Sequence, residues 1–132
     1  PTDWLHLNPT VHHTEPCLGE LTDKFLAGKP SDEFKHREPW LYYVWGHAYE
    51  FDDNDNWDVI EDLCRRVSAD KNVWAATNGD IYDYVKCYES LVYSLDGERV
   101  YNPSHRPVWV EIRAKTYRIG SGETVLFDTV RD

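Results

Sequence analysis

The sequence predicts an α/β fold in which three parallel β-α units are followed by antiparallel β-hairpins. Over residues 4–91, short apolar runs alternate with stretches whose apolar residues recur at helical spacing. Over residues 92–127, short β-like runs are separated by turn residues. Strands that alternate with helices favour right-handed parallel crossovers. We therefore expect residues 1–91 to form an α/β part and residues 92–132 to form a hairpin region of the same domain.

The first unit is expected to begin with a strand at residues 4–8, where leucines alternate with His6. A helix start is predicted at Thr14, and Gly28 is the expected stop. The apolar face of this helix comprises Leu18, Leu21, Phe25 and Leu26.

The second unit centres on an unbroken apolar run at residues 40–45, WLYYVW. A run of this length without alternation is typical of a strand covered on both faces. Gly46 ends the run, and an acidic, amide-rich loop at residues 52–56 supplies the cap of the next helix. The apolar stripe of that helix comprises Trp57, Ile60, Cys64 and Val67.

The third unit has a predicted strand at residues 73–77, a turn at residues 78–80 and a helix whose apolar stripe runs from Ile81 to Leu91. In the hairpin region, apolar residues alternate with others over residues 108–112, which predicts a half-buried strand. Turn residues separate the strands of this region at residues 96–97, 102–103 and 120–122.

Composition excludes some classes of partner. The net charge of −10 disfavours nucleic-acid binding, because an acidic surface repels phosphate backbones. No apolar run approaches the ~20 residues of a membrane helix, so no membrane partner is expected. The three cysteines are odd in number and lack a CxxC pair. They favour buried, reduced thiols at Cys64 and Cys87, which leans towards a cytoplasmic location.

His47 is the leading candidate for chemistry. It follows Gly46 directly, just past the C-terminal end of the predicted central strand. This edge of a parallel sheet is where α/β folds place their reactive groups. An imidazole here can act as a general acid if an acidic neighbour supports it, and Glu50 and Asp52 are the nearest in sequence. The alternative is a structural histidine that ends the strand through a backbone hydrogen bond.

Several segments resemble a known family when they are taken in order. They are Pro9–His13, the Trp-Gly-His-Ala-Tyr-Glu-Phe run at residues 45–51, Asn56-Trp57 and Ala76-Thr77-Asn78. Together they resemble the C-terminal part of polysaccharide deacetylase-like (NodB-type) carbohydrate esterases, over most of residues 4–104. The resemblance implies part of a (β/α)7 barrel, in a chain that is a fragment of a longer protein. It also implies that His47 is the general acid, although the Leu of the family's Leu-any-His motif is absent.

The resemblance further implies a metal and a saccharide. Deacetylation uses a metal-polarised carbonyl, an activated water and an acid for the leaving amine. In the family the metal is held by an Asp and two His from earlier strands, and no matching Asp-Asp or His-xxx-His motif occurs in this chain. We therefore expect a divalent ion (zinc or similar) in the parent protein, no metal ligand in this chain, and no activity from the chain alone. The open edge of the partial barrel would be covered by its upstream half or by another copy in a homo-oligomer.

Four further residues are predicted to bind substrate: His12, His13, Trp45 and Tyr49. The aromatic rings lie at or near expected strand ends and can stack on sugar faces. Adjacent side chains diverge in an extended segment, so one metal ion is not expected to take both His12 and His13. A three-histidine site built from His6, His47 and one of this pair remains conceivable.

Two other functions remain open on the sequence. The missing metal motif and the high aromatic content, with six Trp and nine Tyr, also fit a catalytically silent carbohydrate-binding or assembly module. The local histidines also allow an independent metal-dependent hydrolase.

Overall fold

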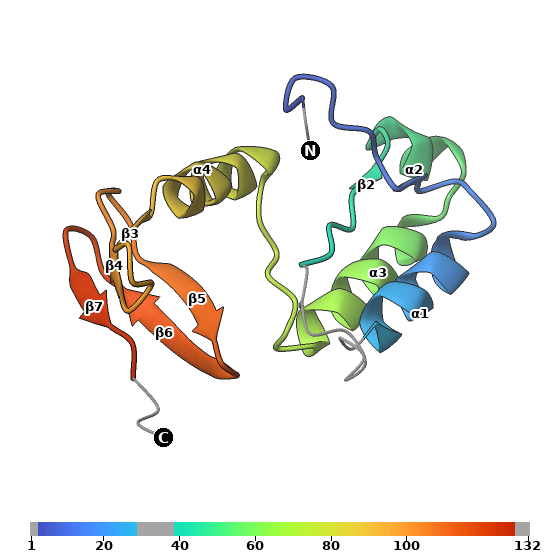
Figure 1. The fold of residues 1–132 in the computed structure, drawn as a ribbon. Coiled ribbons are helices and arrows are strands. Elements are labelled where there is room, and N and C mark those ends of the chain that lie inside the picture. The colour runs from blue at the N-terminus through green and yellow to red at the C-terminus, as the bar shows by residue number, and fades with distance from the viewer. Residues whose placement is uncertain (1–2, 29–38, 129–132) are drawn as a thin grey trace. The chain divides into compact units, whose positions relative to one another are not determined.

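The computed structural model describes residues 3–28 and 39–128 and has a mixed α/β fold with several small sheets (Figure 1). The chain divides into two compact units, residues 1–75 and residues 76–132. The predicted mixture of helices, parallel pairing and antiparallel hairpins is confirmed at this level. The division falls before the third predicted helix rather than after residue 91, so that helix belongs to the same compact unit as the hairpins.

The described residues of the first unit form one parallel strand pair and three helices. Strand β1 (Val11–His12) pairs in parallel with β2 (Val44–Trp45), and the register places His12 opposite Trp45. Helices α1 (Leu18–Ala27) and α3 (Trp57–Ala69) are the predicted helices, although α1 begins at Leu18 rather than at Thr14. A short helix, α2 (Tyr49–Asp53), follows β2 directly. The core of the first unit comprises the buried residues Val11, Leu18 and Leu63. The side chains packed around them include Tyr42, Val44 and Ile60.

The strand predicted at residues 4–8 is wrong, because this segment forms turns. The Asp3 carboxylate accepts hydrogen bonds from the Leu5 backbone N–H at 2.9 Å and pairs with His6 Nδ1 at 2.6 Å. Such local bonds from an aspartate favour a turn over an extended chain. The strand of the first unit begins later, at Val11.

The central strand is shorter than predicted, because only the last two residues of the apolar run pair as a strand. The Tyr43 carbonyl accepts from the Thr10 backbone N–H at 2.7 Å, and Thr10 Oγ1 accepts from the Tyr43 N–H at 3.0 Å. A side chain therefore takes the place of the next backbone rung, and the regular ladder begins only at Val44.

The strand predicted at residues 73–77 is also wrong, because these residues carry no strand pairing. Thr77 instead caps helix α4 (Asn78–Glu89), and the predicted turn at residues 78–80 is the first turn of this helix. Thr77 and Asp80 form a capping box, each side chain bonding the backbone N–H of the other residue. Residues 3–28 and 39–128 therefore contain one parallel strand pair where three β-α units were predicted.

The second unit combines α4 with two small antiparallel sheets. Strands β3 (Val92–Tyr93), β4 (Arg99–Tyr101) and β7 (Thr124–Leu126) form one sheet. Strands β5 (Val108–Ile112) and β6 (Lys115–Ile119) form a hairpin. The predicted alternation in β5 is confirmed, since Val108 and Val110 are buried and Trp109 is exposed. The buried core comprises Val100, Val110, Ile119 and Phe127.

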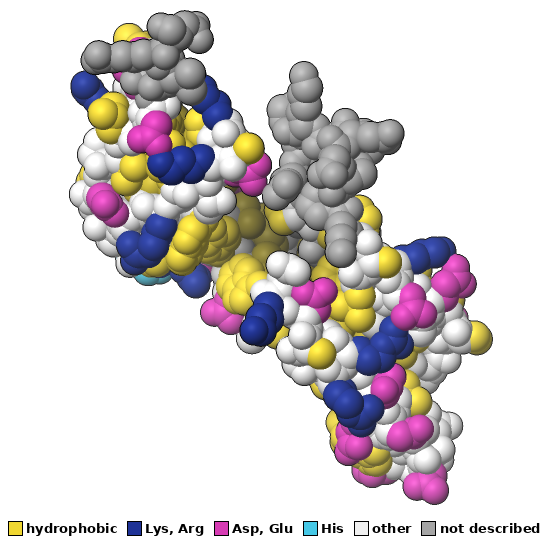
Figure 2. Space-filling view, turned by 90° about the horizontal axis from the view of Figure 1, so that it is seen from below, with side chains coloured by type: hydrophobic (Ala, Val, Ile, Leu, Met, Phe, Trp, Pro, Cys, Tyr) yellow, Lys and Arg dark blue, Asp and Glu magenta, His cyan; other side chains and the backbone are white. Residues whose placement is uncertain are grey.

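The cysteines differ in burial. Cys87 is buried as predicted, but Cys64 is exposed, because Leu63 rather than Cys64 enters the core from α3. No helix in the described part of the chain is long and apolar enough to cross a membrane. On the face drawn in Figure 2, basic side chains of the described residues are interspersed with acidic ones and form no continuous stripe.

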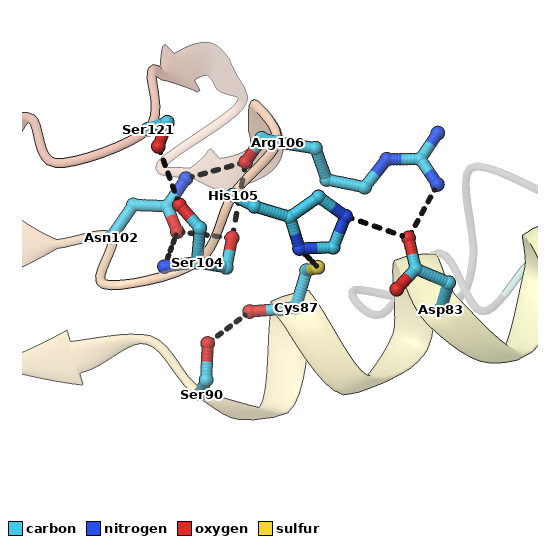
Figure 3. A network of polar contacts seen from close by, with 8 residues as sticks. All are labelled: Asp83, Cys87, Ser90, Asn102, Ser104, His105, Arg106 and Ser121. Carbon is cyan, nitrogen blue, oxygen red and sulfur yellow. Dashed lines mark hydrogen bonds and ion pairs between the residues drawn. The ribbon is translucent and has the colours of Figure 1, made fainter.

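Asn102 is the polar centre of the second unit and is fully buried (Figure 3). Its Nδ2 donates to the Arg106 carbonyl at 2.9 Å and to the Ile119 carbonyl at 3.0 Å. Its Oδ1 accepts from the Ser104 N–H at 2.9 Å and from Ser104 Oγ at 2.6 Å. One amide side chain therefore joins the loop before β5 to the end of β6.

Replacing Asn102 by Ala is expected to destabilise the chain by about 2–4 kcal/mol, because a fully buried amide that makes four hydrogen bonds is lost. The matched control is Ser104→Ala, which removes one hydroxyl and should cost about 1 kcal/mol. Urea unfolding followed by far-UV circular dichroism measures both values. Equal stabilities for the two variants would contradict the central role of Asn102.

Candidate functional site

The candidate site lies at the C-terminal ends of the parallel strands β1 and β2. His12 ends β1 and faces Trp45, which ends β2, across the strand register. His13 follows at once and donates its backbone N–H to the Trp45 carbonyl at 3.0 Å. Helix α2 begins four residues after Trp45 and supplies Glu50. Parallel pairing therefore brings two segments more than 30 residues apart to one edge, as sequence analysis expected for this type of sheet.

A single carboxylate oxygen organises this edge. Glu50 Oε2 accepts the His47 backbone N–H at 2.8 Å and lies 2.8 Å from His13 Nε2 and 3.4 Å from His12 Nε2. The hydrogen bond from the His47 amide, followed by the one from His13, lowers the pKa of the Glu50 carboxyl. Glu50 is therefore ionised over the neutral pH range.

The bond to His47 has a local cause in the sequence. Glu50 stands three residues after His47, in the first turn of α2, and its side chain reaches back to a backbone N–H that precedes the helix. The reach of three residues is that of the acidic side chain in a capping box, but it is displaced by one position, because the N-cap of α2 is Ala48. Sequence analysis named Glu50 only as a neighbour of the His47 ring. The structure places the carboxylate on the His47 backbone and on two other imidazoles instead.

The expectation that His12 and His13 diverge is wrong. Their rings stack with centroids 4.6 Å apart and planes 28° apart. Divergence requires that both residues be extended, but the chain turns here, and the His12 carbonyl accepts from the Glu15 N–H at 3.0 Å. His12 Nδ1 also bonds Thr14 Oγ1 at 2.8 Å, which leaves Nε2 on the side of Glu50.

His13 is the buried member of the pair, with 4% of its surface exposed. Its ring packs on Phe51 with centroids 4.2 Å apart. Because the ionised Glu50 only accepts, Nε2 of His13 carries the donated hydrogen. Nδ1 of His13 is buried and has no partner among the described residues.

Gly46 makes room for His13. Its φ of +154° lies where side-chain-bearing residues are strained, and a Cβ at this position would overlap the His13 ring. The glycine that ends the apolar run is therefore needed twice, once for its backbone conformation and once for the close approach of the imidazole.

Replacing Gly46 by Ala is expected to cost about 2–4 kcal/mol of stability and to move His13 away from Glu50, because strain and overlap act together. Gly97→Ala is the matched control, since Gly97 also has a positive φ, of 69°, but has open space around it. It should cost about 1 kcal/mol. Urea unfolding gives both stabilities, and NMR of the imidazole nitrogens reports the His13 contact. If the Gly46 variant were as stable as the Gly97 variant, the proposed overlap between a side chain at position 46 and the His13 ring would be excluded.

Exposed aromatic rings surround the histidines. Trp45 is 45% exposed and touches His12 edge-on, with centroids 4.6 Å apart. Tyr49 is 60% exposed and stacks on the exposed His47 ring, with centroids 5.3 Å apart. A chain of ring contacts therefore links all five predicted site residues: His13, His12, Trp45, His47 and Tyr49.

His6 does not join this group. Its ring pairs with Asp3 on the preceding turn. The metal-capable groups among the described residues include neither His6 nor His47, so the three-histidine combination is not formed. The described ligand atoms instead gather in two groups, within 4.8 Å in each: His12, His13 and Glu50, and Asp83, Cys87 and His105.

The second group belongs to the hairpin unit and was missed by sequence analysis (Figure 3). Cys87 and Asp83 lie one turn apart on α4, and His105 comes from the connection between β4 and β5. His105 Nδ1 is 3.9 Å from the buried Cys87 sulfur, and Nε2 is 3.2 Å from Asp83 Oδ2. Arg106 also donates to Asp83 Oδ2, at 2.9 Å. The cysteine and histidine are 18 residues apart, so no short motif could reveal the pair.

An open cleft of about 600 Å³ adjoins His13 within the first unit. It is lined by residues of α1 and α3 and by the loop before α3, including Asn56. Asn56 Oδ1 is buried without a partner among the described residues, although Asn56 occupies the N-cap position of α3. The lining at the loop end of the cleft includes the polar residues Asn54, Asn56 and Asp58, and the rest of its wall comes largely from α1 and α3.

Comparisons with protein-family models, with curated proteins and with solved structures found no match to this chain. The assignment of a function therefore rests on the geometry of the strand-end site and on the sequence resemblance.

Proposed function

We propose that this chain forms part of the active site of a polysaccharide deacetylase-like hydrolase, which removes acetyl groups from a saccharide. The observation that carries the proposal is the grouping of His12, His13, Trp45, His47 and Tyr49 through ring contacts at the C-terminal ends of two parallel strands. Both the strand-end argument and the family resemblance select these residues.

His47 is the general acid in this proposal. Its ring is exposed and lies between Trp45 and Tyr49, so a bound saccharide can reach it. Glu50 holds the His47 backbone at 2.8 Å and so sets where the imidazole projects. An imidazole can deliver a proton to a leaving amine near neutral pH. Glu50 acts here as a positioning residue, because its carboxylate bonds the backbone of His47 and not its ring.

Trp45 and Tyr49 form the saccharide platform. Large rings that are about half exposed beside polar groups can stack on the apolar faces of sugars while hydroxyls bond nearby side chains. His12 and His13 lie behind this platform, and only His12 retains appreciable exposure, 18% of its side chain. In the proposal His13 shapes the site, and His12 is the member of the pair that substrate can contact.

The proposal places the rest of the barrel beside the parallel pair. Among the described residues, β1 and β2 form a two-stranded sheet, and each strand has one edge without a pairing strand. Further strands from the upstream half of the barrel, or a second copy of the chain, would cover these edges. A divalent metal ion in the parent protein would polarise the acetyl carbonyl.

His47→Ala in the full-length protein is expected to lower kcat on acetylated oligosaccharides by about 10²–10⁴-fold with little change in KM, because a general acid acts in the transition state. His6→Ala is the control, since His6 is an exposed imidazole on a separate turn. Release of acetate measures both rates. A wild-type rate in His47→Ala would remove the catalytic assignment.

The double variant Trp45→Ala, Tyr49→Ala is expected to weaken oligosaccharide binding at least about tenfold, because the stacking surface is lost. The control is Tyr88→Ala, which removes a comparably exposed ring from α4. Isothermal titration with acetylated oligosaccharides measures both affinities. Equal affinities would exclude the platform. Retained binding with no acetate release from the full-length protein would favour the catalytically silent carbohydrate-binding module instead.

A further inference from the structure

We propose that His12, His13 and Glu50 form a binding site for a divalent transition-metal ion of the zinc class. These residues are not the Asp and two His that the family resemblance assigns to the metal, which come from other strands. The inference rests on the side chains of this chain and does not depend on the proposed function.

The spacing of the ligand atoms fits a metal ion. His13 Nε2 lies 2.8 Å and His12 Nε2 lies 3.4 Å from Glu50 Oε2, and the three ligand atoms lie within 4.8 Å of one another. Metal–ligand bonds of about 2.0–2.1 Å in a tetrahedral site place neighbouring ligand atoms about 3.3 Å apart. To admit an ion, these side chains need only small shifts, and the hydrogen that His13 Nε2 donates to Glu50 must move to Nδ1, which has no other partner among the described residues.

The ligands are already held in position. His12 is fixed by the bond from Nδ1 to Thr14 Oγ1, which leaves Nε2 for the metal. His13 is enclosed by Phe51 and by the backbone at Gly46. Glu50 is tied to the His47 amide. Outer contacts of this kind orient metal ligands and strengthen binding, because less freedom is lost when the ion binds.

The two groups of possible metal ligands differ in the charges around them. The described ion pairs of Glu50 involve only His12 and His13. In the group of Asp83, Cys87 and His105, the guanidinium of Arg106 donates to the same Asp83 oxygen that a cation would need. A cation is therefore attracted to the first group and opposed by Arg106 at the second.

The site also has an open side. The side chains of His12 and Glu50 are 18% and 23% exposed, whereas that of His13 is 2% exposed. Two imidazoles and one carboxylate supply three ligands and leave a fourth position for water or a substrate oxygen, the pattern of catalytic rather than structural zinc sites. Of the exposed aromatic rings, that of Trp45 contacts the ligand His12 directly, whereas Tyr49 contacts His47, which is not a ligand.

The test is titration of the tag-free chain with Zn²⁺ by calorimetry and with Co²⁺ by visible absorption. We expect one ion per chain and a tetrahedral Co²⁺ spectrum. Glu50→Gln, which keeps an acceptor for the His47 amide, and His12→Ala should each weaken binding by at least about tenfold. Circular dichroism checks that both variants remain folded.

The control variants are His105→Ala and His47→Ala. Both should bind the ion like the wild type, and His47→Ala also separates metal binding from the proposed acid catalysis. No bound ion at micromolar Zn²⁺, or binding that His105→Ala abolishes and Glu50→Gln does not, would overturn the proposal.

Discussion

The strand-end site depends on one carboxylate oxygen, Oε2 of Glu50. This oxygen accepts the backbone N–H of His47, just before α2, and pairs with the imidazoles of His12 and His13 at the end of β1. These partners come from two segments that also meet through a two-residue strand pair, a few flanking bonds and the ring contacts of His12 and His13. Because the three contacts share one atom, they are energetically coupled, and changes at His12, His13 and His47 are not expected to add independently.

Sequence patterns predicted the elements that have long, periodic apolar faces. Helices α1 and α3 and strand β5 are where the spacing of apolar residues places them. Parallel pairing was also predicted, but the prediction placed its first strand at residues 4–8, whereas the structure pairs β1 (Val11–His12) with β2. The strands at residues 4–8 and 73–77 failed because side chains near their ends, Asp3 and Thr77, bond the backbone locally. Apolar runs of five residues carry too little information to outweigh such bonds.

The site was predicted in part, for reasons that can be traced to single residues. Trp45, His47 and Tyr49 could be predicted to lie together because they end or follow one apolar run, but the expectation that this run is covered on both faces is wrong, since Trp40 and Trp45 are exposed. Glu50 was missed as the centre because its partners depend on the turn after β1, which no periodicity reveals. The group around Cys87 and His105 depends on the fold of the hairpin unit, where Asn102 fixes the loop that carries His105 (Figure 3). Such long-range contacts leave no trace in short motifs.

The brevity of the β1–β2 ladder has a consequence for motion. Each strand contributes only two paired residues, and the buried Val11 of β1 packs in the same core as Leu18 of α1 and Leu63 of α3. Breaking the two-residue ladder therefore costs the burial of Val11 as well as the paired amides, but it exposes less surface than global unfolding and requires less free energy. During such an excursion the two imidazoles would leave the carboxylate together. The lifetime of the assembled site is then set by local fraying of a few amides, and amide hydrogen exchange at His13 reports it directly.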